Sequence, residues 1–165
     1  MYTSTGINDT PTIVGKATSA ITGGAFLAAK FDANSGIVLA GAGENAIGLM
    51  LATTHDSVAA GEDVTVQIKD IGLWKTGAGV AAGAELTADA AGKAVTATAG
   101  KYVTAIALEK ANAADEIIKV QIVKNGVKAA VTLDDLSDVT ITTATNGQVL
   151  KYDGTKWANG TDATA

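Results

Sequence analysis

Several segments of the chain alternate apolar and polar residues with a period of two. The segment DVTVQIK (63–69) places its three aliphatic residues on one side of an extended backbone, and the segment IKVQIVK (118–124) repeats this arrangement. Such alternation is typical of strands that bury one face. The pattern therefore predicts an all-β chain.

Glycine limits how the remaining segments can fold. In the alanine-rich stretch 77–92, four glycines recur too often for a helix, because each one costs about 1 kcal/mol relative to alanine. We therefore expect loops and short strands there. Asn125-Gly126, directly after the second alternating segment, permits the positive φ angles of a two-residue turn and predicts a β-hairpin.

The strand pattern occurs twice along the chain. Within residues 31–52 and 87–108, Asp32 aligns with Asp89 and Gly48 with Ala105 at an offset of 57, and the segments VTVQI and IKVQI that follow align with an offset of 54. Each copy is predicted to form a turn, two strands, a loop and a further strand. A duplicated unit predicts a small β-barrel or sandwich with pseudo-twofold character. The alternative is chance similarity between two Ala-, Val-, Gly- and Thr-rich segments.

Two turn signals lie close together near the end of the chain. Asn146-Gly147 and Asp153-Gly154 flank the segment QVLKY, and both dipeptides favour type I′ hairpin turns. This arrangement predicts a three-stranded β-meander. Its strands are expected at residues 138–144, 148–152 and 155–159.

The predicted meander has little apolar surface of its own. Its large apolar residues are Leu133, Leu136, Val139, Ile141, Val149, Leu150, Tyr152 and Trp157. These side chains cannot offset the conformational entropy lost by ordering the module, so the three strands need a second apolar surface. Val149 and Leu150 are neighbours in the pleat, so both faces carry apolar groups. We expect a core shared by several chains.

The chain is therefore predicted to contain three parts. Residues 1–20 are polar and rich in Thr and Ser, and they are expected to form an extended N-terminal arm. Residues 21–130 form the β-barrel or sandwich domain. Residues 131–165 form the C-terminal β-module.

Composition and charge argue against several classes of function. Hydrophobic residues make up 47% of the chain but aromatic residues only 4%, so small side chains form a thin core that assembly would supplement. The net charge of −5 argues against nucleic-acid binding and against an anionic membrane surface. The chain has no cysteine, which excludes disulfides and thiolate metal sites. We expect no secretory signal and no transmembrane helix, because Glu44 and Asn45 interrupt the longest apolar run.

Three motifs could carry chemistry, and each has a simpler interpretation. GAGENA (41–46) resembles a nucleotide-binding loop, but no helix pattern follows to bind a pyrophosphate, which favours a glycine turn between strands. His55, the only histidine, lies in a polar loop-like segment and indicates neither a triad nor a zinc site. DDLSD (134–138) has three carboxylates without a calcium-loop spacing, so a solvated turn is favoured over a bound cation. We expect no catalytic residue, metal or cofactor.

Trp74 lies outside the alternating pattern of its segment. Ile71 and Leu73 share one face of the expected strand, and Trp74 falls on the other face. A large aromatic residue at such a position either marks a contact surface or returns to the core through a bulge. Both interpretations remain open from the sequence.

Two parts of the chain resemble components of tailed bacteriophages. Residues 136–159 are similar to a segment that recurs in phage fibre proteins, although Ala144-Thr145 stands where that family often has proline. Residues 21–124 resemble the small β-barrel capsid decoration proteins in the segments TAIALEKA, LTADAAGKAVTATAG and IKVQIV. The agreeing residues of the fibre-like segment are Leu136, Asp138, Val139, Gly147, Gln148, Val149, Leu150, Tyr152, Gly154 and Trp157.

This resemblance implies a phage head fibre or capsid decoration protein. Such a protein is expected to be a homotrimer on the outer capsid surface, with a base that binds the major capsid protein and a C-terminal part that projects outward. Candidate capsid contacts are Tyr2, Ile7 and Trp74. The expected trimer interface consists of Leu136, Val139, Ile141, Val149, Leu150, Tyr152 and Trp157.

Two other functions remain as alternatives. The chain could be an adhesin module that binds glycans on the host surface, although its low aromatic content makes this less attractive. An enzyme is the third hypothesis, and it would have to use His55 or the glycine turn at 41–46.

Overall fold

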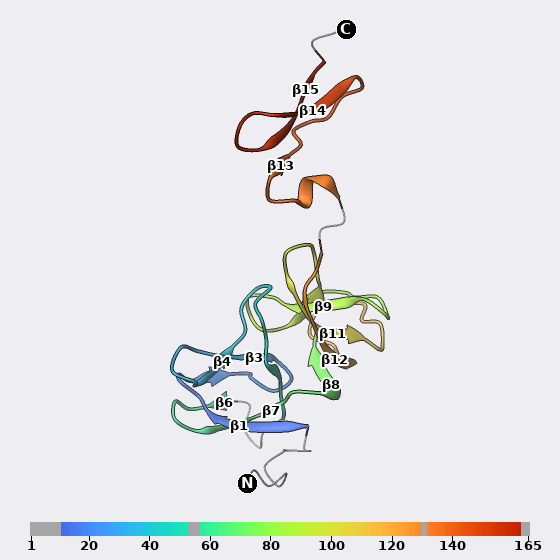
Figure 1. The fold of residues 1–165 in the computed structure, drawn as a ribbon. Coiled ribbons are helices and arrows are strands. Elements are labelled where there is room, and N and C mark those ends of the chain that lie inside the picture. The colour runs from blue at the N-terminus through green and yellow to red at the C-terminus, as the bar shows by residue number, and fades with distance from the viewer. Residues whose placement is uncertain (1–10, 53–56, 130–131, 163–165) are drawn as a thin grey trace, which may run out of the picture. The chain divides into compact units, whose positions relative to one another are not determined.

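The computed structural model describes residues 11–52, 57–129 and 132–162, and the chain divides into two compact units. Unit 1 comprises residues 1–128 and unit 2 comprises residues 129–165. Strands make up nearly all the regular structure of both units (Figure 1), which confirms the all-β fold class.

Unit 1 contains two five-stranded antiparallel sheets with the same strand order. The first sheet has the order β1-β7-β5-β3-β4 and the second has β8-β12-β11-β9-β10, while β2 (Ile21–Thr22) pairs separately with β6 (Ser57–Val58). The first sheet consists of β1 (Thr12–Lys16), β3 (Ala28–Phe31), β4 (Ile37–Leu39), β5 (Gly48–Met50) and β7 (Asp63–Gln67). The second consists of β8 (Asp70–Lys75), β9 (Glu85–Ala88), β10 (Ala94–Thr96), β11 (Tyr102–Ala107) and β12 (Ile117–Val127).

The strand registers confirm the repeat predicted from the sequence. Ala29 pairs with Leu39 in the first sheet, and Leu86 pairs with Thr96 in the second, an offset of 57 on both strands. The pairs that join β3 to β5 and β5 to β7 recur between β9, β11 and β12 with the predicted offsets of 57 and 54. The edge strands β1 and β8 also correspond, with an offset of 59.

Neither sheet closes into a barrel. One isolated bridge, Ala17–Ile37, joins the two edges of the first sheet, and Thr76–Ala94 does the same in the second. Each sheet therefore curls until its edge strands meet at one point, without a continuous ladder between them. A closed barrel is therefore not found, and the two sheets curl but remain open.

The expected pseudo-twofold relation between the repeats is not found. A twofold axis makes every contact reciprocal. Gly43 donates its N–H to Ala88 O of the second repeat, whereas the equivalent Gly100 donates to Lys128 O of its own repeat. The repeats therefore pack through different surfaces, and only their internal folds are equivalent.

Unit 1 contains two hydrophobic cores. At two equivalent positions the repeats differ in side-chain size, because a large residue in one repeat corresponds to a small residue in the other. In the first repeat, Gly15 is so close to the buried Ile37 that an added Cβ would lie 2.8 Å from its Cδ1. At the equivalent positions of the second repeat stand Trp74 and Ala94. Trp74 is fully buried and donates its Nε1–H to Gly92 O at 2.9 Å. The indole thus occupies the core volume that Ile37 occupies in the first repeat.

The expected hairpin at Asn125-Gly126 is wrong. β12 continues from Ile117 to Val127 through this dipeptide, and the β11–β12 register shifts between Val103 and Ala105. Lys124 and Gly126 have φ angles of 49° and 79°. Positive φ angles here produce an irregularity within one strand, because the partner strand continues past the dipeptide.

Unit 2 contains a short 3-10 helix and one three-stranded sheet. Its elements are η2 (Leu133–Asp135), β13 (Val139–Thr140), β14 (Gln148–Tyr152) and β15 (Trp157–Thr161). The sheet order is β13-β15-β14, with β13 parallel to β15. The predicted meander is therefore wrong in topology, because the first strand pairs with the third.

The loops of unit 2 also differ from the predicted type I′ turns. β14 and β15 do form the hairpin expected at Asp153-Gly154, but only Gly154 has a positive φ angle. Asp153 Oδ1 accepts hydrogen bonds from the N–H groups of Thr155 and Lys156, each at 2.8 Å. The side chain of Asp153 thus stabilises a four-residue loop that a type I′ turn would not need.

Part of the segment 1–20 belongs to the folded body of unit 1. β1 pairs along its whole length with β7, and the side chain of Ala17 is buried. The predicted extended arm therefore includes an integral edge strand. Residues 1–10 lie outside the described residues.

Candidate functional site

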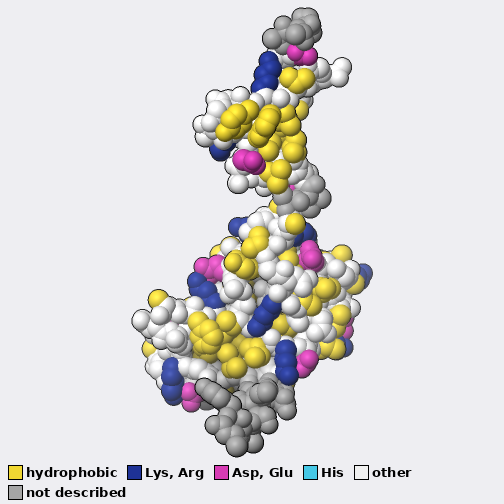
Figure 2. Space-filling model, viewed as in Figure 1, with side chains coloured by type: hydrophobic (Ala, Val, Ile, Leu, Met, Phe, Trp, Pro, Cys, Tyr) yellow, Lys and Arg dark blue, Asp and Glu magenta, His cyan; other side chains and the backbone are white. Residues whose placement is uncertain are grey.

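One face of the sheet in unit 2 is largely apolar. Tyr152 on β14 pairs with Trp157 on β15, which also pairs with Val139 on β13, so these side chains share one face. Leu150 lies on the same face, two residues from Tyr152. Together with Leu133 and Leu136 beside the sheet, these four residues form what we call the apolar face of unit 2. Figure 2 shows hydrophobic side chains gathered over the body that carries β13–β15.

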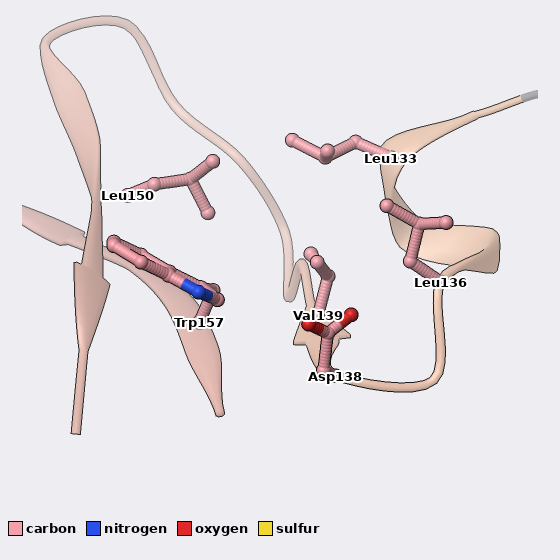
Figure 3. Close-up of a pocket in the computed structure, with 6 residues that line it drawn as sticks. All are labelled: Leu133, Leu136, Asp138, Val139, Leu150 and Trp157. Atoms are coloured by element: carbon pink, nitrogen blue, oxygen red, sulfur yellow. The ribbon is translucent and has the colours of Figure 1, made fainter. Parts of the chain in front are cut away.

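The apolar face contains a groove with a volume of about 360 Å³. Leu150 and Trp157 line one side of the groove, Leu133 and Leu136 line the other, and Val139 lies between them (Figure 3). Asp138 supplies the only charged group among the lining residues. A groove of this composition suits an apolar side chain from another polypeptide, since it offers few polar partners.

Hydrogen bonds within unit 2 hold the two sides of the groove in place. Thr132 and Asp135 form a capping box at the start of η2, and Asp134 Oδ1 accepts the N–H of Ile141 at 2.6 Å. Trp157 donates its N–H to Asp138 O at 2.8 Å. Contacts within the module therefore define both sides of the groove.

A polar side chain ties the loop before β14 to the sheet. Asn159 donates from Nδ2 to Thr142 O at 2.9 Å and to Gln148 Oε1 at 2.7 Å, and its Oδ1 accepts the N–H of Thr142 at 2.8 Å. Because Asn159 shares the face of Leu150, this network forms one polar border of the apolar face.

The structure brings together most of the residues expected at a trimer interface. Leu136, Leu150, Tyr152 and Trp157 remain more than a third exposed, whereas Val139 is 9% exposed and forms the floor of the groove. The Tyr152 and Trp157 rings are in contact, with centroids 5.3 Å apart.

The remaining expected interface residues lie elsewhere. Val149 is on the opposite face of β14, and Ile141 is half-buried beyond the end of β13. Leu133 belongs to the groove but was not among the expected residues. Its apolar side chain next to the DDLSD segment is the signal that could have placed it there.

Two of the three carboxylates of the DDLSD segment stabilise local structure. Asp134 and Asp135 accept the hydrogen bonds described above, while the backbone of Asp138 holds Trp157. No cluster of three metal-ligating side chains occurs within the described ranges. The interpretation of this segment as a turn fits its geometry.

Two sequence-based candidates in unit 1 have structural roles. Trp74 was one candidate capsid contact, but its complete burial removes it from any surface, which corrects that assignment. The GAGENA segment forms a turn between β4 and β5, where Gly43 has a φ angle of 72°, and no helix follows. Tyr2, Ile7 and His55 lie outside the described residues.

No helix in the parts of the chain that the structure describes is long and apolar enough to cross a membrane.

Comparison with known proteins identifies the family. Residues 5–122 match the phage cement proteins, and because this span is well over half of the chain, the chain belongs to that family. Among solved structures, the chain is similar to the N base of head fibre gp8.5 from bacteriophage phi29, with a TM-score of 0.54 and 18% sequence identity. This match covers 71% of the present chain and 97% of the other, and it shows a shared fold. No curated protein matches the chain.

The protein is therefore a structural component of a phage virion that decorates the exterior of the capsid. The matched span ends at residue 122, so this identification depends on unit 1. Unit 2 lies beyond the matched residues, so the family match does not assign its role.

Proposed function

We propose that the protein forms a homotrimer on the capsid, in which unit 1 binds the major capsid protein and the apolar faces of three copies of unit 2 meet. This arrangement stabilises the head and displays unit 2 as a short fibre. The observation that carries the proposal is the apolar face itself, whose large side chains are mostly exposed in the single chain. In this proposal the protein has no catalytic activity and needs no cofactor.

The size of unit 2 supports a partner of the same kind. Val139 is the only buried apolar residue of its described part, and a three-stranded sheet with so small a core is not stable alone. Soluble proteins rarely leave a contiguous apolar patch open to water. A second copy is always present at equal concentration, and the fibre-like sequence of residues 136–159 favours three copies.

Attachment through several copies also suits a capsid-binding protein. Three units 1 held together by units 2 would contact the shell at three points, so that weak individual contacts combine into slow dissociation. Acidic net charge and the absence of cysteine are compatible with this role. Nucleic acid and membrane are not partners in this proposal.

Two neighbouring residues on β14 provide a matched test. Leu150 is on the apolar face and Val149 is on the opposite face, and they are 41% and 39% exposed. We expect Leu150→Asp to reduce the sedimenting mass from trimer to monomer and to lower the number of copies on purified heads. Val149→Asp should leave both unchanged. If Leu150→Asp leaves the mass and the occupancy of heads as in the wild type, the proposal is wrong.

A further inference from the structure

A second concave site lies in unit 1, where the two repeats meet. It has a volume of about 550 Å³ and is lined by Phe31 at the end of β3, Tyr102 at the start of β11, and Ile47. The Phe31 and Tyr102 side chains are 46% and 36% exposed. We call this site the Phe31–Tyr102 pocket. Its volume lies in the range of about 300–1,000 Å³ that is common for small-ligand sites.

The backbone of the second repeat holds the pocket in shape. Gly43 donates its N–H to Ala88 O at 2.8 Å and accepts the N–H of Tyr102 at 3.1 Å. Its φ angle of 72° lies in the left-handed region that favours glycine. The loop that contains Glu44 and Asn45 is therefore fixed against the start of β11.

The polar side-chain groups of the pocket are one ion pair, one amide and the hydroxyl of Tyr102. Lys30 Nζ lies 2.7 Å from Glu44 Oε2, which also accepts the N–H of Gly41 at 2.7 Å. The Lys30 hydrogen bond, followed by that of Gly41, lowers the pKa of Glu44, so the carboxylate is charged at neutral pH. The Asn45 side chain is exposed and has no hydrogen bond to the described residues. The side chains that line the pocket thus offer donors and acceptors, and their two charges cancel.

This combination of groups selects one class of ligand. An anion would have to compete with Glu44 for Lys30, and a cation would have to compete with Lys30 for Glu44. A purely apolar ligand would leave the ion pair without solvent. A saccharide has apolar C–H faces that pack on aromatic rings and hydroxyl groups that bond to charged side chains and amides.

We propose that the Phe31–Tyr102 pocket binds a neutral glycan, with the two aromatic rings against the sugar face and with Lys30, Glu44 and Asn45 bonded to its hydroxyl groups. This binding activity is separate from capsid decoration and from the proposed trimer. In this proposal the pocket lies on a face of unit 1 that is turned away from the shell, where glycans of the host surface can reach it. Each copy supplies one pocket, and many copies on one capsid would strengthen a weak single contact.

The test uses the full chain and an array of neutral oligosaccharides built from glucose, galactose or N-acetylglucosamine. We expect saturable binding of at least one of them, and saturation-transfer NMR should show magnetisation passing to it from aromatic protons. Phe31→Ala and Tyr102→Ala should each weaken binding about tenfold or more, whereas Tyr102→Phe should retain most of it. Ile71→Ala is the matched control, because Ile71 is 56% exposed on β8 and does not line the pocket.

Capsid occupancy and thermal unfolding of the same variants separate this proposal from others. Asn45→Ala removes an exposed amide without touching the rings, so it tests the site even if an aromatic variant fails to fold. Loss of glycan binding with unchanged occupancy supports the proposal. Two results would overturn it: no oligosaccharide of the array binds the wild type saturably, or the aromatic variants lose capsid occupancy instead. The second result would make the pocket a capsid contact.

Discussion

Units 1 and 2 differ in how far they bury their apolar side chains. Every buried hydrophobic residue of the described chain except Val139 belongs to unit 1. Unit 1 curls two sheets around two cores, whereas unit 2 leaves most of its large apolar side chains on one open face. The difference supports the proposal that unit 2 is stabilised by other copies of the chain, whereas unit 1 buries apolar side chains through its own packing.

The duplication within unit 1 explains how a chain with few aromatic residues forms two buried cores. Each repeat contributes one curled sheet. Ile37 fills the first core beside Gly15, and Trp74 fills the second core together with Ala94. Residues of the first repeat, including Ala28 and Leu49, also pack into the core of the second. Small side chains suffice because they are almost completely buried.

Removal of the Trp74 side chain should change the stability of the protein more than any other substitution considered. Trp74→Ala should lower the free energy of unfolding of unit 1 by about 3–5 kcal/mol, because it opens a large cavity and leaves Gly92 O without its indole partner. Denaturant unfolding followed by circular dichroism measures the change. A loss below about 1 kcal/mol would show that the second core does not depend on this ring.

Substitution of Trp157 tests whether the apolar face of unit 2 holds chains together. Trp157→Ala should weaken association of the chains by about 2 kcal/mol or more, because it removes one wall of the groove and the contact with Tyr152. The unfolding midpoint of unit 1 should not change, and the fluorescence of Trp74 reports it separately in this variant. An unchanged association constant would contradict the role of the apolar face.

Substitution of Gly48 tests whether the two repeats have the same space for a methyl group at equivalent positions. A Cβ at Gly48 would lie 2.0 Å from Gln67 O, whereas the equivalent position of the second repeat is Ala105, which is fully buried. Gly48→Ala should therefore destabilise unit 1 by about 1–3 kcal/mol. Ala105→Gly should cost less, about 0.5–1 kcal/mol. Thermal unfolding of both variants gives the comparison, and the reverse order of stability would refute it.

The smallest effect concerns the ion pair in the Phe31–Tyr102 pocket. The pKa of Glu44 in the folded chain is lower than its ordinary value of 4.5, mainly through the Lys30 hydrogen bond. Its stabilisation is therefore present above pH 4.5 and is lost as the pH falls through the folded-state pKa. Because the pair is partly exposed, Glu44→Gln should cost only about 0.2–1 kcal/mol at neutral pH. Unfolding measured from pH 7 to pH 3 should show this difference shrinking, and a constant difference would contradict the assignment.

The sequence was sufficient for features that depend on periodicity. Alternation in residues 63–69 and 118–124 located β7 and the first part of β12, and the offsets of 57 and 54 anticipated the pairing registers. The surplus of apolar residues in the terminal module was also readable, because it depends on composition alone. The resemblance to phage decoration proteins added the class of function.

Other features depend on long-range packing that local sequence does not encode. Asn125-Gly126 permits positive φ angles in a hairpin and in a strand irregularity alike, and only the continued partner strand selects the second. β13 pairs with β15 because η2 and Asn159 hold it there. The small Ala94 leaves room for Trp74 in the second core, as Gly15 leaves room for Ile37 in the first. The Phe31–Tyr102 pocket joins residues 30–47 to Tyr102, which no local motif connects.

Amide hydrogen exchange at two protein concentrations tests most directly whether unit 2 depends on other chains. We expect the backbone amides of β14 and β15 to be protected in concentrated solution and to lose protection on dilution, while those of β11 and β12 keep theirs. Protection of β14 and β15 that persists in a solution shown by sedimentation to contain only monomers of 16.4 kDa would contradict it.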